Sequence, residues 1–130
     1  MIFIDSDCII DFLKGKENAK NIVEKYETEL ATSQINVFEI FFGVYNKKNV
    51  NEKEAVLADN FFNSLSVFPF DNKCGRISAK ILSNLMREGS PIDQNDCFIG
   101  AIMIKNGINS IISNNKRHFL KIKGIKVVTY

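Results

Sequence analysis

The feature that most restricts the fold is a short apolar run at the start of the chain that ends directly in an acid. Ile2, Phe3 and Ile4 are followed by Asp5, without the alternation of apolar and polar residues that a half-exposed strand shows. Such a run is typical of a strand buried on both faces of a parallel sheet. The rest of the chain therefore has to supply helices that cover both faces.

Short apolar segments and longer amphipathic segments alternate along the rest of the chain. Further strands are predicted at residues 30–32, 67–68, 111–112 and 127–128, and helices at 8–13, 17–29, 33–45, 51–64, 74–88 and 97–107, with a short helical turn at 116–120. This order predicts an α/β fold of three layers, α/β/α, around a central and mainly parallel sheet. A chain of 130 residues can bury a core, and we expect residues 1–130 to form a single domain.

Three of the predicted helices begin at residues that can cap them. We expect Asp7 to cap the first helix, Ser33 or Asn36 to cap the third, and Asp96 to cap the helix CFIGAIMIKNG. The third helix also carries an aromatic stripe, which we expect to serve as core or as a dimer contact. Its members are Phe38, Phe41, Phe42 and Tyr45.

The cysteines and the apolar segments indicate the compartment. Cys8, Cys74 and Cys97 are an odd number at spacings that fit neither a metal site nor a redox pair, so we expect buried free thiols. The segment MIFIDSDCII is interrupted by two acids and lacks the flanks of a signal peptide, and no other apolar run is long enough to span a bilayer. We expect a soluble cytoplasmic protein without a membrane partner.

The net charge of +2 is too small to indicate nucleic-acid binding by itself. The C-terminal third, however, is basic and has no acid. Its charged residues between positions 105 and 126 are Lys105, Lys116, Arg117, Lys121, Lys123 and Lys126, with His118 among them. Such a segment can bind a phosphate backbone. A solvated basic edge, or a surface for an acidic partner, explains it equally well.

Three acids are predicted to lie at junctions between strands and helices. Asp5 ends the first strand, Glu39 lies one turn into the helix after the second strand, and Asp96 opens a later helix. Ligands of parallel α/β sheets bind beyond the carboxyl ends of the strands, so the three acids can converge on one edge. Each acid alone has an ordinary structural explanation, as a strand end, a surface residue or an N-cap. Only their joint placement favours a site.

Three converging carboxylates would need a counter-charge. At about 5 Å each pair repels by roughly 3 kcal/mol at an effective dielectric near 20. Protonation or a bound cation relieves this repulsion. Ligation by oxygen alone favours Mg²⁺ or Mn²⁺ over zinc. Such an ion can polarise a phosphoryl oxygen and activate water for attack.

Four segments of the chain resemble, in the right order, the motifs of PIN-domain ribonucleases of the VapC toxin type. The segments are FIDSDCIIDFLKG, SQINVFEIFFG with its Glu, GSPIDQNDCFIGAIMIKNG with an Asp at a helix start, and the closing ISNNKRHFLKIKGIKVV. The resemblance implies a PIN-like fold, and it assigns Asp5, Glu39 and Asp96 as the catalytic acids that bind the metal. It also implies that Ser6 orients Asp5 or a water through its hydroxyl.

The chain departs from the family pattern at several positions. Many members have a fourth Asp where this chain has Asn115, so we assign Asn115 a supporting role and expect a second metal to be weakened. Asp7 stands where Asn is common; an N-cap role suffices for it, with a carboxylate behind the metal ligands as the alternative. Asp93 competes with Asp96, but the spacing to the apolar helix favours Asp96 and leaves Asp93 as a loop cap or supporting acid. We expect His118 at the surface or on phosphate rather than on a metal.

The resemblance implies an endoribonuclease that uses Mg²⁺, with Mn²⁺ as the other candidate ion, to hydrolyse RNA in a single-stranded or loop region. Such proteins are toxins of toxin–antitoxin pairs, are commonly homodimers, and are inhibited by a cognate antitoxin whose C-terminal segment lies along the active-site groove. A housekeeping RNA-processing nuclease and a non-catalytic PIN-like module that binds RNA or protein are the alternatives.

Two other families share parts of the pattern. A haloacid-dehalogenase-like phosphatase also has an apolar strand followed by Asp-Ser-Asp, but it needs a Lys and then a late acidic pair, and no acid follows Asp96 in this chain. A receiver domain needs a central phosphoacceptor Asp at a strand end, whereas Glu39 lies inside a predicted helix. Both are therefore weaker interpretations of the acids.

Overall fold

A five-stranded parallel sheet forms the centre of the computed structural model, which describes residues 1–130. The strand order is β3-β2-β1-β4-β5, and every neighbouring pair is parallel. The strands are β1 (Ile2–Ile4), β2 (Leu30–Ser33), β3 (Ser66–Phe68), β4 (Ser110–Ile112) and β5 (Lys126–Val128). The predicted α/β sheet is confirmed, and it is parallel throughout.

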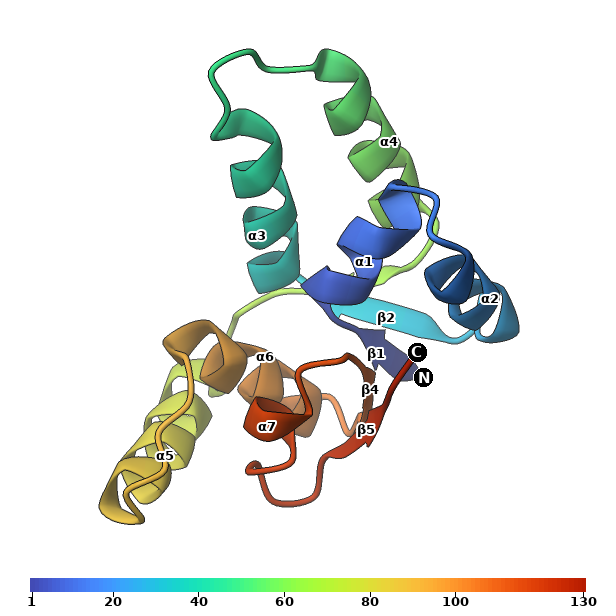
Figure 1. Ribbon diagram of the computed structural model, residues 1–130. Coiled ribbons are helices and arrows are strands. Elements are labelled where there is room, and N and C mark those ends of the chain that lie inside the picture. Colours follow the sequence, from blue (N-terminus) through green and yellow to red (C-terminus); the bar gives the residue numbers. More distant parts are fainter.

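Helices connect the strands and cover both faces of the sheet (Figure 1). They are α1 (Ser6–Leu13), α2 (Glu17–Lys25), α3 (Gln34–Tyr45), α4 (Glu52–Asn63), α5 (Cys74–Arg87), α6 (Gln94–Lys105) and α7 (Lys116–Phe119). The first four lie on one face and the last three on the other, and α3 and α4 extend together away from the sheet. The three-layer α/β/α arrangement is therefore also confirmed.

The first strand separates two apolar cores. Phe3 packs into the core that contains residues of α5 and α6, whereas Ile2 and Ile4 pack into the core of α1 to α4. All three side chains are buried, as the apolar run without alternation predicted. Each such burial contributes about 1.5–3 kcal/mol, so β1 anchors the helices that carry the acids on both faces.

Helix α6 lies unusually close to the segment after α7. A Cβ atom on Gly100 would stand 2.6 Å from Cδ1 of Ile122, which is itself buried. The absence of a side chain at Gly100 therefore allows the two segments to pack together. Asp96 lies one turn earlier on the same helix, so this contact also fixes the acid relative to α7.

The N-terminal ends of α1 and α3 show which polar residues cap them. Ser33 caps α3, where its Oγ accepts a hydrogen bond of 3.3 Å from the backbone N–H of Asn36. The prediction of Asp7 as the cap of α1 was wrong, because that helix starts at Ser6 and Asp5 occupies the N-cap position. Asp7 is instead inside the first turn, where a negative charge is favourable to the helix dipole.

Helix α6 begins three residues earlier than predicted. Its first residue is Gln94, which places Asp93 at the N-cap position and Asp96 in the first turn. The prediction of Asp96 as an N-cap was therefore wrong. The first turn of the helix consists of polar residues that precede the apolar stripe. Hydrophobic periodicity detects only the apolar stripe, so it places the helix start too late. Helix α2 was predicted to residue 29 but ends at Lys25, because a turn leads from it into β2.

The aromatic stripe of α3 divides between core and surface. Phe41 packs on Phe62 of α4 with ring centroids 6.0 Å apart. Phe38, Phe42 and Tyr45 are exposed by 59%, 56% and 53%. A core role is therefore wrong for these three residues, and the dimer contact remains a prediction.

The structure also tests two predictions, that the cysteines are free thiols and that no segment spans a membrane. Cys8, Cys74 and Cys97 are buried and unbridged, which confirms that they are free thiols. None of the helices combines the length and apolar character that crossing a membrane requires.

Candidate functional site

The candidate site lies where the order of the strands reverses. Chain connections run outward from β1 on one side and from β4 on the other, and ligands of such sheets bind beyond the carboxyl ends of the strands at this point. Asp5 follows β1, and its backbone N–H donates to the carbonyl of Ile112, the last residue of β4. Ser113 follows β4 directly. The fold thus brings the start and the end of the chain together at one edge.

Asp5 is the most buried acid of the site, with an exposure of 6%. The Ser113 hydroxyl donates to its Oδ2 over 2.8 Å, and the Asn36 amide donates to its Oδ1 over 3.3 Å. Burial, and after it the negative charge of Asp7, raises the pKa of Asp5 to about 7. Two neutral donors therefore hold a carboxylate that has no cationic partner.

Glu39 is tied to α1 and to α6. Its Oε1 accepts a hydrogen bond of 2.8 Å from the hydroxyl of Ser6, and its Oε2 accepts one of 3.5 Å from the Asn95 amide. Asn36 donates to the same Ser6 hydroxyl over 3.0 Å. Ser6 therefore contacts Glu39, whereas the resemblance implied a contact with Asp5 or a water. Burial raises the pKa of Glu39 as well.

Asp96 faces the loop after β4 and helix α7. Its Oδ2 accepts a hydrogen bond of 3.1 Å from the Asn115 amide and lies 2.5 Å from Nδ1 of His118. Burial raises the pKa of Asp96, and the hydrogen bond with His118 opposes that rise. His118 was expected at the surface or on phosphate; it is half-buried and contacts an acid of the site instead.

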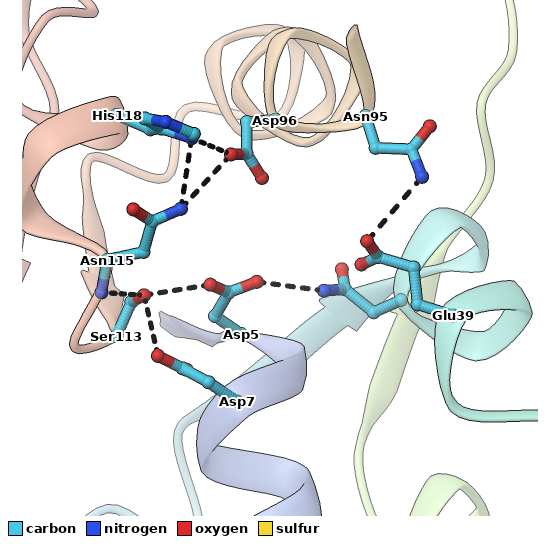
Figure 2. Close-up of polar contacts among 9 residues, drawn as sticks. Asp5, Asp7, Glu39, Asn95, Asp96, Ser113, Asn115 and His118 are labelled. Carbon is cyan, nitrogen blue, oxygen red and sulfur yellow. Dashed lines mark hydrogen bonds and ion pairs between the residues drawn. The ribbon is translucent and has the colours of Figure 1, made fainter. Parts of the chain in front are cut away.

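These side chains form one continuous polar network (Figure 2). The backbone N–H of Asn115 donates to the Ser113 hydroxyl over 2.9 Å, which joins the Asp96 side of the network to Asp5. Asn36 and Ser6 join Asp5 to Glu39 on the other side. All three predicted acids thus line the same network, and neutral amides and hydroxyls separate them.

Asp7 stands behind Ser113, away from Asp96. Its Oδ2 accepts a hydrogen bond of 2.9 Å from the backbone N–H of Asn114 and lies 3.3 Å from the Ser113 hydroxyl. Asn114 in turn accepts from the backbone N–H of Tyr130. Asp7 therefore fixes the loop that presents Ser113 to Asp5, and its charge acts on Asp5 from behind.

The tightest group of possible metal ligands differs from the predicted one. Asp93, Asp96 and His118 each offer a ligand atom, and these atoms lie within 4.8 Å of one another. Asp5, Glu39 and Asp96 do not form such a group among themselves. Asp93 is exposed at the N-cap position of α6, and its side chain makes no capping hydrogen bond. The three predicted acids surround a wider space.

The donor set of the network fits a hard divalent cation. The ion pairs of the chain are Lys16–Asp11, Lys47–Glu54, Lys105–Asp71 and His118–Asp96, so no Lys or Arg neutralises Asp5, Asp7 or Glu39. Burial of uncompensated carboxylates is costly, and a cation would offset that cost. Asp5, Glu39 and Asp96 offer oxygen atoms only, which suits Mg²⁺ or Mn²⁺.

Three residues of the network were missed as site residues or given another role. Asn36 was considered only as a helix cap, yet it is fully buried and contacts both Asp5 and Ser6. Ser113 directly follows a predicted strand, so the rule that identified Asp5 would also have found it. Asn95 adjoins Asp96, and no sequence signal distinguishes it from an ordinary residue of the first helical turn.

The chain is thus an α/β protein with a parallel sheet and a cluster of carboxylates at the switch point of that sheet. Residues 2–125 match the PIN domain, so the chain belongs to the PIN domain family. The match covers nearly the whole chain and includes all of the predicted acids.

Relatives and solved structures agree with this assignment. The chain is 28% identical over 130 residues to Ribonuclease VapC1 of Rickettsia felis, covering 98% of this chain and 95% of that one. It is 28% identical over 99 residues to Ribonuclease VapC3 of Methanocaldococcus jannaschii, covering 76% and 94%. These matches confirm the resemblance to VapC-type PIN ribonucleases.

The fold is similar to that of solved toxin–antitoxin structures. The crystal structure of VapBC2 from Rickettsia felis bound to a DNA fragment from its promoter superimposes with a TM-score of 0.87 at 22% identity, covering 100% of this chain and 99% of that one. DNA-bound VapBC from Salmonella typhimurium gives a TM-score of 0.85 at 23% identity, covering 99% and 98%. At these identities the likeness shows the shared fold.

Proposed function

We propose that this chain is a metal-dependent endoribonuclease and the toxin of a toxin–antitoxin pair. The observation that carries the proposal is the cluster of buried carboxylates without a Lys or Arg partner at the switch point of the sheet. Sequence relatives over most of the chain are named Ribonuclease VapC. A nuclease of this kind acts in the cytoplasm, where its RNA substrate lies.

Asp5, Glu39 and Asp96 are the residues that hold Mg²⁺, with Mn²⁺ as the other candidate. When bound, the ion supplies a Lewis acid for a phosphoryl oxygen of RNA and for the attacking water. The protein's part is to orient the three carboxylates through Ser6 and Asn115 and the buried donors around them. Because Asn115 is uncharged, the site carries one negative charge fewer than a site with Asp at this position.

The RNA backbone needs cations next to the acids, and α7 supplies them. Lys116 and Arg117 are exposed on the helix that also carries His118, beside Asp96. Lys105, in contrast, is engaged with Asp71. The acid-free basic segment is thus free to bind phosphates mainly through α7 and the residues after it.

A groove between α1, α3 and α4 is the surface we assign to the antitoxin. Its apolar floor comes from Ile10, Leu13, Ile40, Val44 and Leu57, and Glu39 of the metal-binding group lies in its wall. A segment with apolar anchors can occupy the floor and reach Glu39 at the same time. The partner would therefore block the site while it binds. Solved neighbours described as VapBC complexes accord with such a partner.

The third partner that we infer is a second copy of this chain. The two copies would form a homodimer through the exposed aromatic face of α3. Phe38 and Phe42 stack with ring centroids 5.8 Å apart and are both more than half exposed. Phe42→Glu is expected to convert the dimer to a monomer, because it places a charge in an apolar contact. Light scattering after gel filtration measures this mass. Met86→Glu on α5, where Met86 is 62% exposed, is the matched control and should leave the mass unchanged.

The activity is tested with purified protein and RNA. Cleavage is expected with Mg²⁺ or Mn²⁺ and should stop when EDTA removes the ion. Cleavage that persists in excess EDTA would contradict the proposal. Metal binding without any cleavage would instead support a non-catalytic PIN-like module. An upstream reading frame for a DNA-binding antitoxin distinguishes the toxin from a housekeeping nuclease.

The roles of Asp96 and Asp93 are separated by calorimetry with Mg²⁺. Asp96→Asn is expected to lower the affinity at least about tenfold, because Asp96 is buried within the network. Asp93→Asn should change it only severalfold, because Asp93 is exposed and outside the network. A larger loss for Asp93→Asn than for Asp96→Asn would show that Asp93 is the metal-binding acid.

A further inference from the structure

Two adjoining hollows lie along α5, outside the acidic network. The first, of about 370 Å³, lies between α5, Ile104 near the end of α6 and the segment that follows α7. The second, of about 610 Å³, lies along the first half of α5. Ile77 and Lys80 line both hollows. The two therefore form one continuous surface, which we call the α5 track.

Cations far outnumber acids in the α5 track. Glu88 is the one acid among the residues that line it. None of the cations of the track forms an ion pair within the chain, and all but one are exposed. Unpaired charges of one sign on one surface create a potential that attracts a polyanion. The cations are Lys73, Arg76, Lys80, Lys121 and Lys123.

The α5 track continues from the candidate metal site along one face of α6. Asp96, Gly100 and Ile104 follow one another at intervals of four residues, so they share this face. Ile122 packs over Gly100, and Ile104 lines the track about 12 Å along the helix axis from Asp96. A nucleic-acid strand at the acids can therefore extend onto the track.

The lining of the track favours nucleic acid over a protein partner. Three cations and a single apolar residue, Ile77, line the second hollow, whereas the cores of protein interfaces are depleted of charged residues. Interfaces with nucleic acids are more polar and much more positive. The apolar residues of the first hollow are all Ile or Leu, so no aromatic ring is available for stacking of bases. The track therefore suits the phosphates of a strand.

We propose that the α5 track binds the phosphate backbone of the RNA outside the segment that is cleaved, and that it does so without reading sequence. Contacts to phosphates position a nucleic acid but carry no sequence information. The track raises the affinity for a long RNA and leaves the chemical step to the acids around Asp5. The inference rests on the proposed function for the identity of the polyanion.

The test measures how salt changes the binding of a fluorescein-labelled single-stranded RNA to the full chain, in EDTA so that the RNA is not cleaved. Lys73→Gln/Arg76→Gln/Lys80→Gln removes three exposed cations of the track. Each phosphate contact to a single strand contributes about 0.7 to the slope of log affinity against log salt, so the slope should fall by about 2. At about 50 mM salt the affinity is expected to fall at least about tenfold. Fluorescence anisotropy measures both quantities.

The matched control removes the same number of cations from the opposite face of the sheet. Lys20→Gln/Lys25→Gln/Lys53→Gln changes three exposed lysines of α2 and α4 and gives the same net charge. Its affinity should fall less than about threefold, because charges farther from the strand than the Debye length are screened. Urea unfolding of both variants shows that each is still folded.

Equal slopes and equal affinities in the two triple variants would overturn the inference, because the cations of the track would then be solvated or would meet an acidic protein. In cleavage assays with Mg²⁺, the track variant should raise KM for the same RNA and leave kcat within about twofold. A lower kcat with unchanged KM would also contradict the inference. Binding in EDTA does not depend on catalysis, so Mg²⁺-dependent cleavage by the unsubstituted protein remains a separate test of the proposed function.

Discussion

Asp5→Asn is expected to lower Mg²⁺-dependent RNA cleavage at least about 1000-fold, equivalent to about 4 kcal/mol of transition-state stabilisation. Asp5 is the most buried acid of the site and lies between the two halves of the polar network. An asparagine keeps the size of the side chain but removes the negative charge that we propose as a ligand of the cation. Initial cleavage rates on a labelled RNA measure the loss. Asp59→Asn, an exposed acid on α4, is the matched control and should retain full activity.

The same substitution should change how stability depends on pH. The pKa of Asp5 is raised to about 7, so its contribution to stability is present at low pH and is lost as pH rises through about 7. Between pH 5 and pH 8 the titration of Asp5 is expected to lower the free energy of unfolding of the metal-free protein by about 3 kcal/mol. The decrease is about 1.4 kcal/mol for each pH unit up to pH 7. Asp5→Asn should not show this loss.

Urea unfolding in EDTA at the two pH values measures this difference. A loss of stability toward pH 8 that is as large in Asp5→Asn as in the unsubstituted protein would assign the pH dependence to another group. Undiminished RNA cleavage by Asp5→Asn would exclude Asp5 from the catalytic centre altogether.

Asn36→Ala is expected to destabilise the metal-free protein by about 2–4 kcal/mol and to weaken Mg²⁺ binding about 10- to 100-fold. Asn36 is fully buried and donates to both Asp5 and Ser6, and its Oδ1 accepts a hydrogen bond of 2.6 Å from the Ser33 hydroxyl. Alanine would leave all three groups short of a partner. The orientation of Asp5 would then no longer be fixed from the α3 side.

Urea unfolding and calorimetry with Mg²⁺ measure the two effects separately. Asn60→Ala on α4 is the control, because Asn60 is exposed and makes no side-chain hydrogen bond within the chain. A change in stability for Asn36→Ala no larger than for Asn60→Ala would mean that water replaces the missing donor. In that case Asn36 would not be a structural element of the site.

The sequence was sufficient to place the three acids because each lies at a junction that local patterns reveal. Asp5 ends an apolar run, Glu39 lies in a helix just after a predicted strand, and Asp96 precedes an apolar helix. Alternation of strands and helices then fixed their common edge, since every crossover between parallel strands returns to the same end of the sheet. Those features depend on residues near one another in the chain.

The contacts between the acids could not be predicted in the same way. Whether the Ser6 hydroxyl turns to Asp5 or to Glu39 depends on the packing of α1 against α3, and in the structure it donates to Glu39. The contact of His118 with Asp96 depends on how closely α7 approaches α6, which Gly100 permits. Such distances arise from tertiary packing between residues far apart in sequence.

The central place of β1 in the sheet has a consequence for the synthesis of this protein. Asp5 is made 108 residues before its partner Ser113, which directly follows β4, the strand on the other side of β1. Non-local pairing of this kind forms late, because the intervening chain must fold before the strands can meet. A growing chain on the ribosome therefore has no assembled centre until β4 emerges.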